Sequence, residues 1–323
     1  MISGLKIAGI SVEFQPGGGH FTLKPEPTTN SSSAMPNDLE PLTELAVYSF
    51  QNAPQLCVEE HACCDYHRIW SLARLANPIG PNLAGWQFLH RQLAILTDTQ
   101  PSPRVLISGA ADTGLLSLVL AGLKDSHANA QIILVDRCAT PVRQNEQLCE
   151  KLNADAQFYV ADILNFDGEP VDVILAHSFL NFFDPAERGD LFANWARLLN
   201  PNGKILLSNR IEQQPGVKLD PPSCADLESR LNVLKKVANT LELNDVDQKS
   251  LIDAAKRCRS KELTSKPAFT DLELGEIVRS TGLQLQSLSL HERSACKGKG
   301  PLATAYSDQG KRAEIVLQRV RVD

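Results

Sequence analysis

The most constraining feature of this sequence is an alternation of short apolar runs with amphipathic segments between residues 103 and 211. The apolar runs are residues 105–108, 132–135, 157–161, 171–176 and 204–208. In the segments between them, the apolar residues recur at helical spacing. Strands that are apolar throughout, separated by amphipathic helices, are typical of a parallel sheet that helices cover on both faces.

After Ile211 this alternation stops for some fifty residues and then resumes. Thr270 and Glu273 form a capping box for a helix that Gly282 ends. Two more strands follow, at residues 283–290 and 313–320. We therefore predict an α/β fold with a doubly wound, mostly parallel, seven-stranded Rossmann-like sheet. An N-terminal helical cap precedes the sheet, and a helical insertion follows its fifth strand.

The rest of the chain divides into further units. We expect residues 1–41 to form an arm. Residues 1–24 read as two extended pieces of a hairpin, and residues 25–41 read as a polar linker. Helical periodicity over residues 42–100 predicts the cap. The sheet domain comprises 101–211 and 267–323. Two helices with one apolar stripe each form the insertion at 212–266.

The candidate functional residues follow the predicted strands, where each strand ends. In chain order they are the loop Gly109–Gly114, then Asp136, then Asp162 with Ile163, and then His177. Ligands of open parallel sheets bind beyond these strand ends, at the point where the strand order reverses. A glycine-rich turn permits close backbone approach. The second-strand acid can accept both ribose hydroxyls and the third-strand acid an adenine amino group, so the set suits an adenosine.

Four ordered segments resemble the motifs of class I S-adenosylmethionine-dependent methyltransferases: VLISGAADTG, VDRC, ADI at 161–163 and LLNPNGKILLS. The resemblance covers residues 103–210 and, less specifically, 268–323. It implies a methyltransferase whose last strand is antiparallel and inserted beside the fifth. It also implies S-adenosylmethionine as the cofactor, contacted by Ser108, Gly109, Ala110, Asp112, Gly114, Asp136, Arg137, Asp162, Ile163 and His177.

Two positions depart from the family pattern. Ile107 stands where the family usually has an acid, and the GAADTG loop is one residue longer than usual. Asp112 is the carboxylate available to replace the missing contact to the methionyl amino group. His177 lies where the fourth strand opens toward a substrate and serves either as a general base or as a structural residue. Cys138 either touches the adenosine or packs.

The sequence favours an O or N atom of a small-molecule acceptor. The Asn-Pro-Pro-Tyr run of amide and DNA-base methylation is absent after the fourth strand, where the chain reads HSFLNFF. The helices of 42–100 and the insertion would then form the acceptor pocket, with the insertion as a mobile cover. One alternative is a non-catalytic binding module that forms a homodimer through residues 1–24. Others are aminopropyl transfer and a nicotinamide-dependent oxidoreductase, although Tyr-x-x-x-Lys and GxGxxG are both missing.

Composition narrows the partners. A net charge of −6 provides no basic field for nucleic acid, and no apolar run approaches the roughly 20 residues that span a bilayer. The eight cysteines lack the paired spacing of disulfide frameworks or zinc ribbons, which predicts a cytoplasmic protein. On a predicted helix, Cys63 and His67 lie on one face and His61 and Cys64 lie on another, so the two pairs point in different directions. We therefore predict no metal site.

Overall fold

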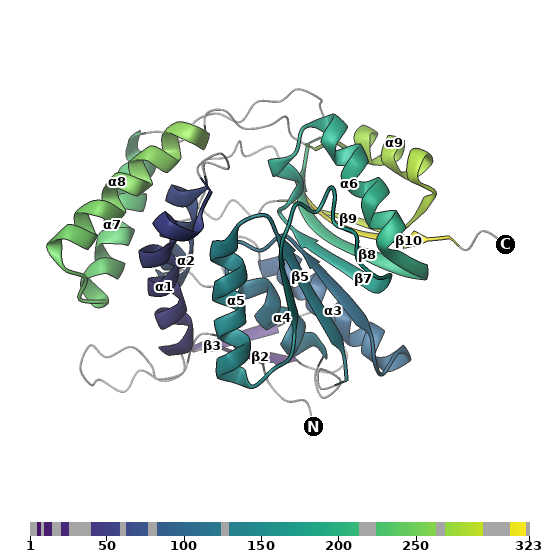
Figure 1. Ribbon diagram of the computed structural model, residues 1–323, viewed down its shortest axis with the longest axis horizontal. Coiled ribbons are helices and arrows are strands. Elements are labelled where there is room, and N and C mark those ends of the chain that lie inside the picture. Colours follow the sequence, from purple (N-terminus) through teal and green to yellow (C-terminus); the bar gives the residue numbers. More distant parts are fainter. Residues whose placement is uncertain are drawn as a thin grey trace.

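A seven-stranded sheet with helices on both faces forms the centre of the molecule (Figure 1). The computed structural model describes residues 5–7, 10–14, 21–25, 40–58, 63–76, 83–123, 129–212, 224–262, 269–292 and 311–320. The strands of the large sheet are β4 (Arg104–Ser108), β5 (Gln131–Asp136), β6 (Gln157–Val160), β7 (Val171–His177), β8 (Leu199–Ile211), β9 (Leu283–Glu292) and β10 (Lys311–Arg319).

The strand order is β6-β5-β4-β7-β8-β10-β9. The first five strands in this order pair in parallel, and β10 lies antiparallel between β8 and β9. This confirms the predicted fold class and the inserted antiparallel strand. The order reverses at β4, which has β5 on one side and β7 on the other. The carboxyl ends of these three strands therefore form the edge at which a ligand is expected.

Each face of the sheet has its own core, because side chains alternate along the strands. Val105 and Ile107 of β4 pack under α3 (Leu83–Thr99) and α4 (Gly114–Leu123). Leu106 points to the opposite face, which α6 (Pro185–Leu198) and α9 (Asp271–Thr281) cover. Helix α5 (Ala139–Leu152) lies beside β5 and β6.

The predicted ends of α9 are confirmed, whereas the turn predicted before the fifth strand is wrong, because these residues belong to the strand itself. Thr270 Oγ1 accepts a hydrogen bond from the Glu273 N–H at 3.2 Å, and Gly282 ends α9 with φ 69°. The predicted turn at 200–203 lies inside β8, where the register with β7 shifts and Asn202 has φ 67°. The strand thus extends to both sides of an irregularity that the turn signal located.

Four helices form a second packed group beside the sheet (Figure 1). They are α1 (Glu40–Leu56), α2 (Cys64–Ala76), α7 (Cys224–Thr240) and α8 (Asp245–Glu262). Phe50, Leu72, Leu234 and Leu251 are buried between them. The predicted cap and insertion therefore share one core. Helix α3, which we grouped with the cap, instead packs on the sheet through Leu89 and its neighbours.

The N-terminal arm contains a small antiparallel sheet rather than a single hairpin. Strand β2 (Ile10–Phe14) pairs with β1 (Leu5–Ile7) on one side and with β3 (Phe21–Pro25) on the other. The glycine turn before β3 and the linker at 26–39 lie outside the described residues. Among the described helices, none is both long and apolar enough to cross a membrane.

Candidate cofactor site

The loop after β4 is built around a glycine in a left-handed conformation. Gly109 has φ 78°, and its N–H donates to the Val135 carbonyl at 2.9 Å. A Cβ on Gly109 would lie 2.2 Å from the ring of Phe179, so a larger residue is excluded by both conformation and contact. Gly114 begins α4 under equally close contacts, since its Cβ would lie 2.0 Å from Nη1 of Arg74.

Asp136 ties the ends of β4 and β5 together. Its Oδ2 accepts from the Ala110 N–H at 2.9 Å and its Oδ1 from the Cys138 N–H at 2.7 Å. Burial raises the pKa of this carboxyl, and the two backbone donors act in the opposite direction. Each oxygen of an ionised carboxylate has two lone pairs, so both can still accept a hydroxyl. The side chain is half-buried at the strand end where the sequence placed it.

The residues after β6 present one exposed acid beside one buried apolar side chain. Asp162 is exposed, and its Oδ1 accepts from the Leu164 N–H at 3.0 Å, which shapes the turn. Ile163 is buried in the core under α6, and its carbonyl accepts from Asn194 at 2.6 Å. Arg137, the exposed neighbour of Asp136, projects from the same edge of the sheet.

Asp112 is paired within the protein. Nη1 of Arg74, on α2, donates to both of its carboxylate oxygens at 2.7 and 2.8 Å, and the Gly114 N–H donates to Oδ1 at 2.7 Å. The Arg74 guanidinium also lies 5.0 Å from the ring centre of Trp86. The carboxylate that we expected to replace the missing acid therefore joins α2 to the cofactor loop. Ile107 itself is fully buried under α3 and α4.

Two predicted residues, Ser108 and His177, sit at the strand ends in different ways. Ser108 is fully buried, and its hydroxyl accepts from Trp195 Nε1 at 3.1 Å, so its side chain holds α6 to the sheet. His177 packs edge-on against Trp86, with 5.7 Å between ring centres, and its Nε2 is buried without a hydrogen-bond partner. Burial first, and then the charges of Arg312 and Arg74, hold its pKa well below the ordinary value of 6.5.

The residue after His177 has an unusual backbone. Ser178 has φ 53°, and its hydroxyl accepts from Nη2 of the buried Arg312 at 2.8 Å. Arg312 comes from β10, and its Nη1 also donates to the Ser208 hydroxyl at 2.9 Å. Non-glycine residues in this conformation are uncommon and are often found at functional sites. Here the strained residue aims the segment that carries Phe179 over the glycine loop.

Several residues of this edge carried no signal in the sequence. Arg74 and Trp86 come from α2 and α3, and neither belongs to a recognisable motif. Phe179 belongs to the HSFLNFF segment, whose aromatic content was visible but whose contact with Gly109 was not. Cys63 and His67 do come together, as their helical spacing predicted. Their other neighbours are Cys57 and Cys138, while His61 lies outside the described residues.

A known protein family matches the part of the chain that contains the loops after β4, β5, β6 and β7. Residues 110–203 match a family described as "Methyltransferase domain". The carboxy-S-adenosyl-L-methionine synthase of Ruthia magnifica subsp. Calyptogena magnifica is 31% identical over 102 residues. That match covers 31% of this chain and 42% of the relative, so this chain spans less than half of the relative's length.

Solved structures with the same general description are also similar. A putative sarcosine dimethylglycine methyltransferase from Galdieria sulphuraria has 11% identity and a TM-score of 0.49, over 74% of this chain and 86% of that one. The N-methyltransferase NodS from Bradyrhizobium japonicum has 12% identity and a TM-score of 0.42, over 73% and 87%. Residues 110–203 of this chain thus match a methyltransferase domain, and the strand order of the sheet is the one that the resemblance to class I S-adenosylmethionine-dependent methyltransferases implied.

Proposed function

We propose that the protein transfers a methyl group from S-adenosylmethionine to an O or N atom of a small-molecule acceptor. One observation carries the proposal. A glycine loop with φ 78° at Gly109 and a half-buried acid at Asp136 meet at the reversal point of the strand order. Most of that edge, including Asp136 and Asp162, lies within the segment that matches the methyltransferase family.

The residues of this edge fit the cofactor. The free lone pairs of Asp136 can accept the two ribose hydroxyls, and the exposed Asp162 can accept the adenine amino group. Arg74, already beside Asp112, supplies a positive charge for the carboxylate of the methionine part. The Phe179 ring occupies the space that a side chain at position 109 would fill. A ligand that approaches the Gly109 backbone must therefore either displace this ring or pack against it.

The cofactor supplies a methyl group on a positively charged sulfur, which makes that carbon electrophilic. What this chain contributes is alignment of the acceptor, exclusion of water and removal of a proton where the acceptor has one. His177 is the candidate for the last task, because its buried Nε2 has no hydrogen-bond partner and could accept a proton from an acceptor placed beside it. This role for His177 is part of the proposal.

The acceptor side of the site is rich in aromatic rings. Phe182 is half-exposed, and its ring centre lies 6.4 Å from the ring centre of Phe179 and 6.4 Å from that of Tyr66 on α2. Trp86 completes the aromatic surroundings next to His177. An acceptor with an apolar or aromatic body and one nucleophilic O or N atom would match these groups. Helices α7 and α8, which pack on α2, would then act as the cover.

The cofactor step is tested with S-adenosylhomocysteine by calorimetry and thermal unfolding, with NAD as the control ligand. A ligand at 100 times its dissociation constant stabilises the folded state by about 2.7 kcal/mol. We expect an upward shift in melting temperature with S-adenosylhomocysteine and none with NAD. A folded sample that does not respond to millimolar S-adenosylhomocysteine would exclude the proposal.

The cover is tested by hydrogen exchange of residues 224–262. We expect faster exchange there than in the sheet strands of the free protein, and slower exchange when cofactor and acceptor bind together. Helices α7 and α8 share a buried core with α1 and α2, and a stable core of this kind would slow their exchange. Exchange as slow as that of the sheet, with and without ligands, would make this segment a static part of the molecule.

The curated relative suggests a second candidate reaction. Its name states that it makes carboxy-S-adenosyl-L-methionine, so the product is a derivative of the cofactor rather than a methylated acceptor. Product analysis with methyl-labelled S-adenosylmethionine separates the two reactions. Label found in a new small molecule together with S-adenosylhomocysteine supports methyl transfer, whereas a modified cofactor that retains its label supports the second candidate.

We also propose a cytoplasmic location and a dimer contact through the N-terminal arm. The six described cysteines whose side chains are placed form no disulfide, which is consistent with the reducing cytoplasm. We assign any homodimer contact to the small sheet of the N-terminal arm, because its outer strands β1 and β3 pair, within the described residues, only with β2. Cell fractionation tests the location. Light scattering of the full chain and of a chain lacking residues 1–25 tests the dimer contact.

A further inference from the structure

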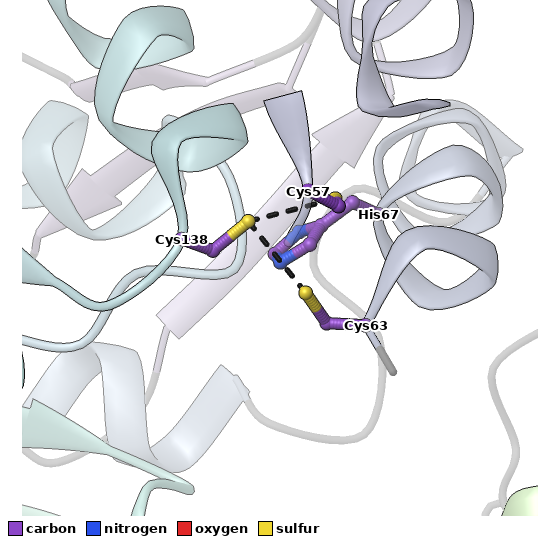
Figure 2. A group of neighbouring side chains, drawn as sticks. All are labelled: Cys57, Cys63, His67 and Cys138. Atoms are coloured by element: carbon purple, nitrogen blue, oxygen red, sulfur yellow. Dashed lines mark hydrogen bonds between the residues drawn. The ribbon is translucent and has the colours of Figure 1, made fainter. Parts of the chain in front are cut away.

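Three cysteines and one histidine converge at a point that the proposed reaction does not use. Figure 2 shows Cys57, Cys63, His67 and Cys138 with their side chains directed toward one another. One potential ligand atom from each lies within 4.8 Å of all the others. Sγ of Cys138 lies 3.5 Å from that of Cys57 and 3.6 Å from that of Cys63. We call these four residues the Cys₃His cluster.

The cluster is assembled from three separate segments. Cys57 directly follows α1, Cys63 precedes α2, and His67 lies in the first turns of α2. The Cys63 carbonyl accepts from the His67 N–H at 3.0 Å, which places both side chains on the same side of the helix start. Cys138 follows β5, and its sulfur is separated by 81 sequence positions from that of Cys57. Such convergence depends on the tertiary fold.

Several contacts hold the cluster in place. Cys138 occupies the N-cap position of α5, a position that Ser, Thr, Asp and Asn usually take, and its side chain makes no capping bond. Its sulfur is directed into the cluster instead. The Thr140 hydroxyl lies 3.1 Å from Sγ of Cys57, and the Ser49 hydroxyl donates to the His67 carbonyl at 2.9 Å. These two contacts fix Cys57 against the start of α5 and join α1 to α2 beside the cluster.

We propose that the Cys₃His cluster is a structural zinc site. Zinc prefers tetrahedral sites of thiolate and imidazole, and Cys₃His is one of its usual sets. Two sulfurs bound to one tetrahedral zinc at about 2.3 Å lie about 3.8 Å apart, close to the two separations found here. Four protein ligands leave no position for water or substrate, so the ion is structural rather than catalytic. Binding releases protons, because the thiols bind as thiolates.

A disulfide and simple apolar packing both fit this arrangement less well than a metal ion does. A disulfide would bring two sulfurs to about 2.05 Å and leave the third cysteine and the imidazole without a role. Packing of apolar cysteines does not account for a buried histidine whose ring nitrogen lies among three sulfurs. One metal ion accounts for all four residues together.

The site lies directly beside the proposed cofactor edge. The N–H of Cys138 donates to Oδ1 of Asp136 at 2.7 Å, so the residue that binds the metal also orients the acid at the end of β5. Of the other three ligands, Cys57 and Cys63 lie between α1 and α2, and His67 lies in the first turn of α2. The zinc ion therefore fastens this helical group to the sheet at the place where a ribose would bind, and fixes Asp136 in the process.

The first test measures metal in the full chain, purified under reducing conditions without chelator. We expect one zinc ion per chain by mass spectrometry, and a mercurial reagent should release it only as cluster thiols react. The apo chain should take up one Co²⁺ with visible d–d absorption and thiolate charge-transfer bands. A reduced, folded chain that retains no zinc and takes up no Co²⁺ overturns the proposal, whether or not any variant folds.

The second test uses variants with a matched control. Cys138→Ser and His67→Ala should lose the zinc and unfold at lower temperature, whereas Cys64→Ser should keep both. Cys64 is adjacent to Cys63 and similarly half-buried but does not belong to the cluster. Equal metal loss from Cys64→Ser would show that the ligands are misassigned, and full retention by Cys138→Ser would show that the cluster does not bind the ion.

The third measurement separates this inference from the proposed function. Removal of zinc should weaken S-adenosylhomocysteine binding by about tenfold, because Asp136 loses its fixed orientation and charged hydrogen bonds of this kind are worth that much. Unchanged affinity in the folded, zinc-free chain would contradict the coupling to Asp136. A zinc-loaded chain that fails to bind S-adenosylhomocysteine would leave the metal site intact and refute only the proposed function.

Discussion

The ion pair between Arg74 and Asp112 should be the most costly single contact to remove at the cofactor loop. The Asp112 side chain is 9% exposed and that of Arg74 is 17% exposed, so water can replace the lost partner only in part. Breaking a buried pair by removing one partner costs about 3–5 kcal/mol in other proteins. Asp112 keeps the Gly114 N–H in the Arg74→Met variant, which reduces the loss, while the Trp86 contact adds to it. We expect the free energy of unfolding to fall by roughly 3 kcal/mol.

Asp112→Asn is the matching change on the other side of the pair. The amide oxygen can still accept from Gly114, so we expect a loss of about 1–2 kcal/mol. The double variant should then show a coupling energy of at least about 1 kcal/mol between the two positions. Urea unfolding, followed by fluorescence and circular dichroism, measures all three free energies. Arg143→Met, which breaks the exposed pair with Glu146, should cost far less than Arg74→Met.

Two results would refute this reasoning. If Arg74→Met costs no more than Arg143→Met, the pair is not effectively buried in solution. If the effects of Arg74→Met and Asp112→Asn are additive, the two side chains do not depend on each other. Either result would also remove the argument that α2 is fixed to the cofactor loop through this contact.

Three further predictions concern the strand ends. Gly109→Ala should lower stability by more than the roughly 1–2 kcal/mol of a left-handed residue, since its methyl meets the Phe179 ring; in urea unfolding, the same change should cost less in a Phe179→Ala background than in the unmodified chain. Calorimetry should find that Asp136→Ala weakens S-adenosylhomocysteine binding more than Asp162→Ala, because two hydroxyls lose their acceptor; equal losses would mean that the ribose and adenine assignments are wrong. Burial and two nearby arginines hold the pKa of His177 in the folded chain well below 6.5. Below about pH 6.5 only the unfolded chain takes up this proton, so the free energy of unfolding decreases as the pH is lowered. His177→Gln should remove up to about 1.4 kcal/mol per pH unit of that slope; identical slopes in both proteins would show that His177 is not buried in its neutral form.

The sequence determined most of the sheet. The strands of the sheet domain are apolar wherever helices cover both faces, and each ends at a change of composition, so β4 to β7 could be located to within a residue or two. The loop at Gly109 and the acid at Asp136 follow from the same pattern, because a residue just beyond a parallel strand must lie at the carboxyl edge. Local rules of period and capping suffice for these features.

What only the tertiary structure decided are the contacts between segments that lie far apart in the sequence. The apolar stripes of α1, α2, α7 and α8 are visible in the sequence, but nothing in them specifies that the four helices share one core. Arg74 meets Asp112 across 38 positions, which turns a candidate cofactor contact into an internal ion pair.

The Cys₃His cluster illustrates the same limit. Cysteine spacing along one helix predicted only the pair Cys63 and His67, and the remaining two sulfurs come from the end of α1 and the start of α5. Spacing along the chain encodes local geometry, whereas a metal site needs four atoms at one point in space. That point exists here only because the sheet places the end of β5 against the connection between α1 and α2.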